Sequence, residues 1–179
     1  MIKIFLVEDE VVMRNGIKNN IPWEKEGLLF AGEASDGELA YPLIKKVQPD
    51  ILITDIRMPF MDGLELSELV KKEFPRIKII ILSGYNEFDY AKQAIHIGVT
   101  DYLLKPITAS KLLEAVKKVA EVIEREREEE NMLERYRLEM AENTVLDRQR
   151  LFKDLVTSRI SFKEALERGE QLGMELSAS

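Results

Sequence analysis

The 179-residue sequence has no cysteine and only one histidine, His96. The lack of cysteine excludes disulfide frameworks, zinc–thiolate sites and thiol nucleophiles, and a single histidine argues against a histidine-based metal site or a serine–histidine catalytic unit. No apolar run exceeds four residues, and the first residues lack the pattern of a secretory leader. We therefore expect a cytoplasmic protein with no membrane partner, whose metal chemistry, if present, uses oxygen ligands.

An excess of positive charge is also lacking. The chain has 26 Lys+Arg against 33 Asp+Glu, for a formal net charge of -7 and a pI of about 5.0. On average such a chain repels a phosphate backbone, so it is not expected to bind nucleic acid by itself. Its length suits one domain with an appendage, or two very small domains.

Before Pro106, short apolar runs rich in β-branched residues alternate with helix-like stretches. Strands are expected over Ile2–Val7, Leu29–Glu33, Ile51–Thr54, Ile77–Leu82 and Asp101–Leu104. Helices are expected over residues 11–19, 37–47, 64–74 and 88–97, and from 109 onward. The strands show little polar alternation, which indicates a sheet covered on both faces. The sequence predicts an α/β fold with a doubly wound, five-stranded parallel sheet that binds small ligands at the carboxyl ends of its strands.

After Pro106 the chain becomes denser in charge and contains almost no helix breaker until Gly169. A helically spaced apolar stripe over 112–123 can pack on the sheet, and a wholly charged run follows over 124–130. We expect a domain over residues 1–120, an extended helical linker over 121–144, and the start of a helical inter-domain region over 145–179. The heptad register does not run cleanly, so the linker is either a parallel dimeric coiled coil or a single solvated spacer.

Acidic residues cluster where the predicted strands end. Glu8 and Asp9 follow the first strand and Asp55 follows the third, so their carboxylates meet at one edge of the sheet. Carboxylates that close together need either a raised pKa or a cation, and a few carboxylates with waters usually bind Mg²⁺. Ser83 and Lys105 follow the last two strands, and the whole set suits phosphoryl transfer to Asp55 as the nucleophile. Each residue alone also fits a turn, a helix cap or a strand exit, so the prediction depends on their joint placement.

Residues 1 to about 120 resemble the receiver domain of two-component response regulators, the CheY-like family with the flavodoxin-like strand order 2-1-3-4-5. The matching features are the acidic pair Glu8–Asp9, the strand ILITD ending in Asp55, the motif RMPFMDG, Ser83, Tyr102 and Lys105–Pro106. The first acidic position is Glu rather than Asp, which is a mild departure.

The resemblance implies that Asp55 accepts a phosphoryl group from the phosphohistidine of a sensor histidine kinase. It also implies that Mg²⁺ is held by Asp9, Asp55, the backbone carbonyl of Arg57 and, through water, Glu8. The protein would then be a phosphoacceptor that assists its own phosphorylation and dephosphorylation, rather than an enzyme.

The resemblance assigns the remaining matched residues to binding and switching. Ser83 and Lys105 would bind the phosphoryl oxygens, and the Lys105–Pro106 bond would be cis. Tyr102 would be the switch aromatic, which turns inward when the Ser83 hydroxyl moves to the phosphoryl group. The alternative for Tyr102 is a strand aromatic packed permanently on the core.

Three segments look more particularly like AraC-type response regulators: SGYNEFDYAKQAIHIGVTDYLLKP, NNIPWEKEGLLFAGEA and LFKDLVTSRISFKEALERGEQLGM. This resemblance implies control of transcription and a homodimer formed through the face of the fourth and fifth helices, the linker helix, or both. A helix-turn-helix output domain would follow. We expect this chain to stop short of it, so that DNA is bound only through that absent domain.

Two other functions remain open. Phosphatases of the haloacid-dehalogenase type also use a strand-end Asp nucleophile, Mg²⁺, Ser or Thr, and Lys, but they place a second Asp two residues after the nucleophile. Arg57 occupies that position here and cannot act as the general acid or base, which disfavours turnover of phosphate esters. The third possibility is a scaffold with a vestigial acidic pocket, in which the long helix is the functional element.

Overall fold

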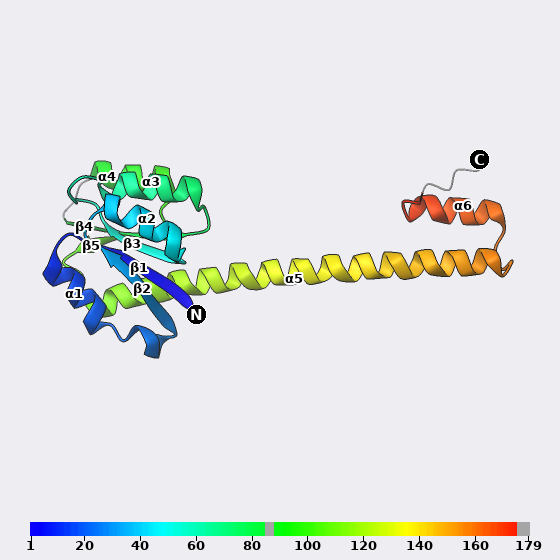
Figure 1. Cartoon of the computed structure of the whole chain (residues 1–179), viewed down its shortest axis with the longest axis horizontal. Coiled ribbons are helices and arrows are strands. Elements are labelled where there is room, and N and C mark those ends of the chain that lie inside the picture. The colour runs from blue at the N-terminus through cyan, green and yellow to red at the C-terminus, as the bar shows by residue number, and fades with distance from the viewer. Residues whose placement is uncertain (85–87, 175–179) are drawn as a thin grey trace. The chain divides into compact units, whose positions relative to one another are not determined.

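The computed structural model describes residues 1–84 and 88–174 (Figure 1). The chain divides into two compact units, Met1–Glu124 and Arg125–Ser179. In the described residues the strands are β1 (Ile2–Val7), β2 (Leu28–Ala34), β3 (Ile51–Asp55), β4 (Lys78–Gly84) and β5 (Asp101–Lys105). The helices are α1 (Val11–Asn20), the short 3₁₀ helix η1 (Trp23–Glu26), α2 (Gly37–Val47), α3 (Gly63–Glu73), α4 (Phe88–Ile97), α5 (Ala109–Val156) and α6 (Phe162–Gln171).

The five strands form one parallel sheet in the order β2-β1-β3-β4-β5, which confirms the predicted α/β topology. The strands β3, β4 and β5 run one or two residues further than predicted. Their ladder includes the pairs Asp55↔Leu82 and Gly84↔Lys105. Asp55 and Lys105 are therefore the last residues of their strands, held by the sheet itself rather than by the loops that follow.

Alternating side chains of the strands build two cores, one on each face of the sheet. On one face, Ile4, Leu6 and Ile53 pack with Ile17 of α1 and Leu112 of α5. The other core lies beneath α2, α3 and α4 and contains Phe5, Val7, Leu52, Ile44, Leu66 and Ala94. Figure 1 shows these two groups of helices on opposite sides of the sheet. Both faces are covered, which explains why the strands read as continuous apolar runs.

The first turns of α5 belong to the unit that carries the sheet. Leu112, Val116, Val119 and Ile123 are buried there, as the helical spacing of the apolar residues predicts. In the described residues of the chain, no helix is both long enough and apolar enough to cross a membrane.

The second unit contains the rest of α5 and α6. The boundary expected at residue 144, between the linker and the helical inter-domain region, falls inside α5, which continues without interruption to Val156. Thr144 lies within the helix, and its hydroxyl donates to the Met140 carbonyl oxygen at 2.8 Å. From residue 125 to 143 the side chains are exposed, including Met132, Tyr136 and Met140.

The chain reverses after α5 to form a helical hairpin within the second unit. Ser161 caps α6, and its side-chain oxygen accepts a hydrogen bond from the Glu164 backbone N–H at 3.2 Å. Leu151 and Ala165 are buried, and the Arg148 guanidinium donates to the Leu172 carbonyl oxygen at 2.7 Å. Large side chains such as Phe152 and Val156 remain exposed, so the hairpin buries only part of its apolar surface.

The start of α3 lies directly against the end of β3, and this contact requires glycine at position 63. A Cβ atom on Gly63 would lie 1.8 Å from the Asp55 carbonyl oxygen.

We predict that Gly63→Ala lowers the free energy of unfolding by about 2 kcal/mol or more, because helix and strand must separate. Gly16→Ala is the control, since the nearest atom lies 3.9 Å from its Cβ position inside α1. Gly16→Ala should raise the free energy of unfolding by about 0.5–1 kcal/mol, because alanine has a higher helix propensity than glycine. Urea denaturation measures both variants, and equal stabilities would contradict the packing described.

Candidate functional site

Three carboxylates meet at the carboxyl edge of the sheet. Glu8 and Asp9 directly follow β1, and Asp55 ends the neighbouring strand β3. One carboxylate oxygen from each of the three residues lies within 4.8 Å of those of the other two. Glu8 is fully buried, Asp55 is 7% exposed and Asp9 is exposed. The structure thus brings together the acidic residues that the sequence placed at this edge.

Lys105 supplies the positive charge of the site. Its Nζ lies 2.9 Å from Glu8 Oε2 and 2.9 Å from Asp55 Oδ2, so one ammonium group bridges two buried carboxylates. The Lys105 side chain is 19% exposed. In the β4–β5 ladder Lys105 pairs with Gly84. This pairing fixes the position at the end of the sheet from which the Lys105 side chain extends.

Backbone groups hold the second oxygen of each bridged carboxylate. The Ile56 N–H donates to Asp55 Oδ1 at 2.7 Å, and the Glu10 N–H donates to Glu8 Oε1 at 3.2 Å. The Thr54 hydroxyl donates to the Asp55 carbonyl oxygen at 2.9 Å. Both carboxylates are therefore oriented from two sides, by the main chain and by Lys105.

The pKa shifts follow from this burial and pairing. Burial is the largest influence on Glu8 and raises its pKa, the hydrogen bond from Lys105 opposes that rise, and the charge of Asp55 adds to it. For Lys105, burial favours the neutral amine, but the hydrogen bonds and charges of Asp55 and Glu8 outweigh burial and raise its pKa. Lys105 therefore stays protonated at neutral pH.

The other predicted residues lie around this cluster. Ser83 is buried in β4, one residue beyond the ladder partner of Asp55. The Tyr102 ring packs against the core beneath α2, α3 and α4, and its hydroxyl is buried without a hydrogen-bond partner in residues 1–84 and 88–174. Arg57 is exposed, two residues after Asp55. The Lys105–Pro106 peptide bond is cis, as the resemblance implies.

One residue at this edge had not been predicted. The Arg14 side chain of α1 donates from Nη1 to the Glu8 carbonyl oxygen at 2.6 Å. Its Nε also lies 4.0 Å from Glu33 Oε1 on β2. The only hint in the sequence is a basic residue in the first helical turn after the acidic pair, and that pattern also fits an ordinary surface arginine.

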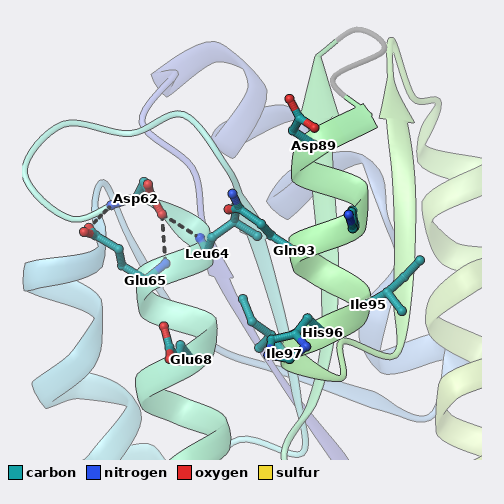
Figure 2. Close-up of a pocket in the computed structure, with 10 residues that line it drawn as sticks. Asp62, Leu64, Glu65, Glu68, Asp89, Gln93, Ile95, His96 and Ile97 are labelled. Carbon is teal, nitrogen blue, oxygen red and sulfur yellow. Dashed lines mark hydrogen bonds between the residues drawn. The ribbon is translucent and has the colours of Figure 1, made fainter.

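A large hollow lies away from this edge, between α3 and α4 (Figure 2). It measures about 1060 Å³ and is lined by Leu64, Glu68 and Ile97, among others. At its rim Asp62 and Glu65 form the capping box of α3, drawn as dashed lines in Figure 2. No residue of the carboxylate cluster lines the hollow, so the chemistry of the cluster does not depend on it.

A family model, sequence relatives and solved structures all indicate the same protein family. A family model described as the response regulator receiver domain matches residues 4–117. The transcriptional regulatory protein YesN of Bacillus subtilis, described as uncharacterized, is 40% identical over 126 residues, covering 70% of this chain and 34% of YesN. The transcriptional regulatory protein HptR of Staphylococcus aureus is 39% identical over 113 residues, covering 63% of this chain and 44% of HptR.

Solved structures agree with the sequence relatives. The receiver domain of AraT, a response regulator from Geobacillus stearothermophilus, is 40% identical with a TM-score of 0.66, covering 70% of this chain and 97% of that one. A CheY-like receiver domain protein from Methanospirillum hungatei is 25% identical with a TM-score of 0.65, covering 70% and 98%.

The chain spans 34% to 50% of the length of the first curated relatives that it matches, and several of these are transcriptional regulators. The family model spans more than half of this chain. In agreement with the strand order and the carboxylate cluster, the chain belongs to the family of response regulator receiver domains, whose members are regulatory proteins rather than classical enzymes.

Proposed function

We propose that Asp55 accepts a phosphoryl group from the phosphohistidine of a sensor histidine kinase, and that the modified receiver controls a transcriptional output domain. The observation that carries this proposal is the Lys105 ammonium, which lies 2.9 Å from the carboxylates of both Glu8 and Asp55 at one sheet edge. Because such a kinase takes its phosphoryl group from ATP, the reaction belongs to the cytoplasm.

The transfer is a substitution at phosphorus. A carboxylate oxygen of Asp55 forms the new P–O bond, the P–N bond to the histidine breaks, and the imidazole leaves with that electron pair and takes up a proton. Asp55 is held for this attack by the Ile56 N–H. Lys105 already touches Asp55 Oδ2, so its charge lies where negative charge develops on the phosphoryl oxygens. Hydrolysis of the acyl phosphate by water returns the free carboxylate.

The carboxylate cluster fits a divalent cation. Three carboxyl groups lie around one ammonium, and the ligand atoms that these three groups offer are all oxygens. Asp9, Asp55 and the Arg57 backbone carbonyl would hold the ion, and Glu8 would contribute beside them. When bound, Mg²⁺ supplies positive charge that reduces the repulsion between these carboxylates and an incoming phosphoryl group.

Tyr102 and Ser83 connect the phosphoryl group to the surface. The Tyr102 ring lies inward here, but its hydroxyl is buried without a partner in the described parts of the chain. A buried hydroxyl without a partner costs about 1–3 kcal/mol, which acts against the inward position of the ring. Recruitment of the Ser83 hydroxyl and Lys105 by the phosphoryl oxygens shifts the equilibrium between inward and outward positions of the ring.

We propose that the phosphorylated receiver acts as a homodimer that positions an AraC-type DNA-binding domain. On the face formed by α4, β5 and α5, Ile95 is 78% exposed and Leu104 is 51% exposed. The α5 segment beyond residue 124 also exposes Met132, Leu133 and Met140, which a coiled-coil linker would bury against a second copy. DNA would be contacted through the output domain alone.

The acceptor is tested by replacing Asp55. Incubation with Mg²⁺ and acetyl phosphate or phosphoramidate should add about 80 Da, one phosphoryl group, to the intact mass of the wild-type chain. Asp55→Asn should add nothing, because the amide cannot form an acyl phosphate. Asp62→Asn is the matched control, since asparagine also caps a helix and that variant should gain the full mass. Mass gain in Asp55→Asn would show that another residue is the acceptor.

Lys105→Ala tests the charge balance of the cluster. Removal of the ammonium leaves Glu8 and Asp55 buried without their cation, so the metal-free protein should lose about 3–5 kcal/mol of stability. Mg²⁺ should still bind, and should raise Tm by more than it does in the wild-type protein. Phosphorylation of this variant should no longer change the conformation.

Lys118→Ala, which removes only an exposed ion pair with Glu114, should resemble wild type. A smaller Mg²⁺-dependent shift in Lys105→Ala would contradict the assigned role.

Light scattering over a concentration series tests the dimer. Phosphorylation of the wild-type chain should lower the concentration at which dimers form, and Asp55→Asn should not respond to the phosphodonor. A monomer at every concentration, with and without phosphorylation, would leave the linker as a solvated spacer.

A further inference from the structure

Arg14 connects three parts of the fold at the acidic edge. Its Nη1 donates to the Glu8 carbonyl oxygen at 2.6 Å, and its Nε lies 4.0 Å from the Glu33 carboxylate on β2. Glu33 is held in turn by Lys18 of α1, whose Nζ lies 3.2 Å from Glu33 Oε2. The Arg14 side chain is 16% exposed. A largely buried guanidinium thus holds the peptide group that joins Glu8 to Asp9.

This position is unfavourable for α1 itself. Arg14 lies in the first turn of the helix, where the positive end of the helix dipole disfavours a cation. The first turn contains no acidic residue, and Glu10 at the N-cap makes no side-chain capping bond. The local sequence therefore weakens the helix start, whereas the contacts of Arg14 lie outside the helix, with Glu8 and Glu33.

The contact matters most for Asp9. Glu8 has further anchors, because its N–H donates to the Ala34 carbonyl oxygen at 3.1 Å and its side chain is bonded to Lys105 and Glu10. Asp9 is exposed, yet its carboxylate lies with the other two of the cluster. Since Arg14 fixes the carbonyl of the preceding residue, it fixes the backbone from which the Asp9 side chain extends.

We propose that Arg14 is a positioning residue of the divalent-cation site: through the Glu8 carbonyl and Glu33 it orients Asp9. The inference rests on the proposed function, because it concerns the same cation site. Residues that orient metal ligands affect affinity by about 10- to 100-fold when they are replaced.

The test measures Mg²⁺ binding to the whole chain by titration calorimetry. Arg14→Met should weaken Mg²⁺ binding about 10-fold. Arg14→Lys should recover part of the affinity, because an ammonium can satisfy either Glu8 or Glu33 but not both. Lys18→Met is the matched control: it removes a cation from the same helix and from the same Glu33 carboxylate, but makes no contact with Glu8, and should keep wild-type affinity.

A second readout separates positioning from a purely structural role. With acetyl phosphate as donor, the Mg²⁺ concentration for half-maximal phosphorylation should rise about 10-fold in Arg14→Met, while the rate at saturating Mg²⁺ stays near that of wild type. Lower stability with unchanged Mg²⁺ affinity in Arg14→Met would overturn the inference, as would an equal loss of affinity in Lys18→Met. Failure of the wild-type chain to bind Mg²⁺ would instead overturn the proposed function.

Discussion

The fold concentrates negative charge at one edge of its sheet and offsets it there with one lysine. Parallel strands bring Glu8, Asp9 and Asp55 together because β1 and β3 are neighbours and end at the same edge. Lys105 can bridge two of these carboxylates because β5 ends on the same side. Because burial makes uncompensated charge costly, the negative charge of these carboxylates must be balanced by a lysine, by a metal ion or by protonation.

The remainder of the domain keeps this edge rigid. Continuous apolar strands, covered on both faces, leave little freedom for Asp55 or Lys105, which lie in the ladder itself. The close approach of Gly63 to the Asp55 carbonyl oxygen fixes the loop after β3 from the other side. The same packing that stabilises the sheet therefore also holds the Asp55 carboxylate in place before any reaction partner binds.

Much of the fold and of the cluster could be predicted because both depend on strong, local signals. Apolar runs and turn residues fix the strands, and the carboxyl-edge rule then groups the acidic residues with Lys105. Three features could not be predicted in this way. The boundary expected at residue 144 falls inside α5, because the helix continues beyond the change in composition, and the inward position of the Tyr102 ring depends on tertiary packing against the core beneath α2, α3 and α4. The contact of Arg14 with Glu8 joins elements that only the tertiary structure brings together.

Charge also explains how a small modification can act beyond the acceptor. In the structure Lys105 is fully engaged, with Glu8 on one side and Asp55 on the other. In the proposed reaction, a phosphoryl group on Asp55 would replace the charge of that carboxylate by a larger negative charge further out and would attract the Lys105 ammonium toward the new oxygens. Lys105 ends β5, three residues after Tyr102 and four before α5 begins. On this proposal, a displacement of the Lys105 ammonium would act on the strand that carries Tyr102 and on the segment that leads into α5.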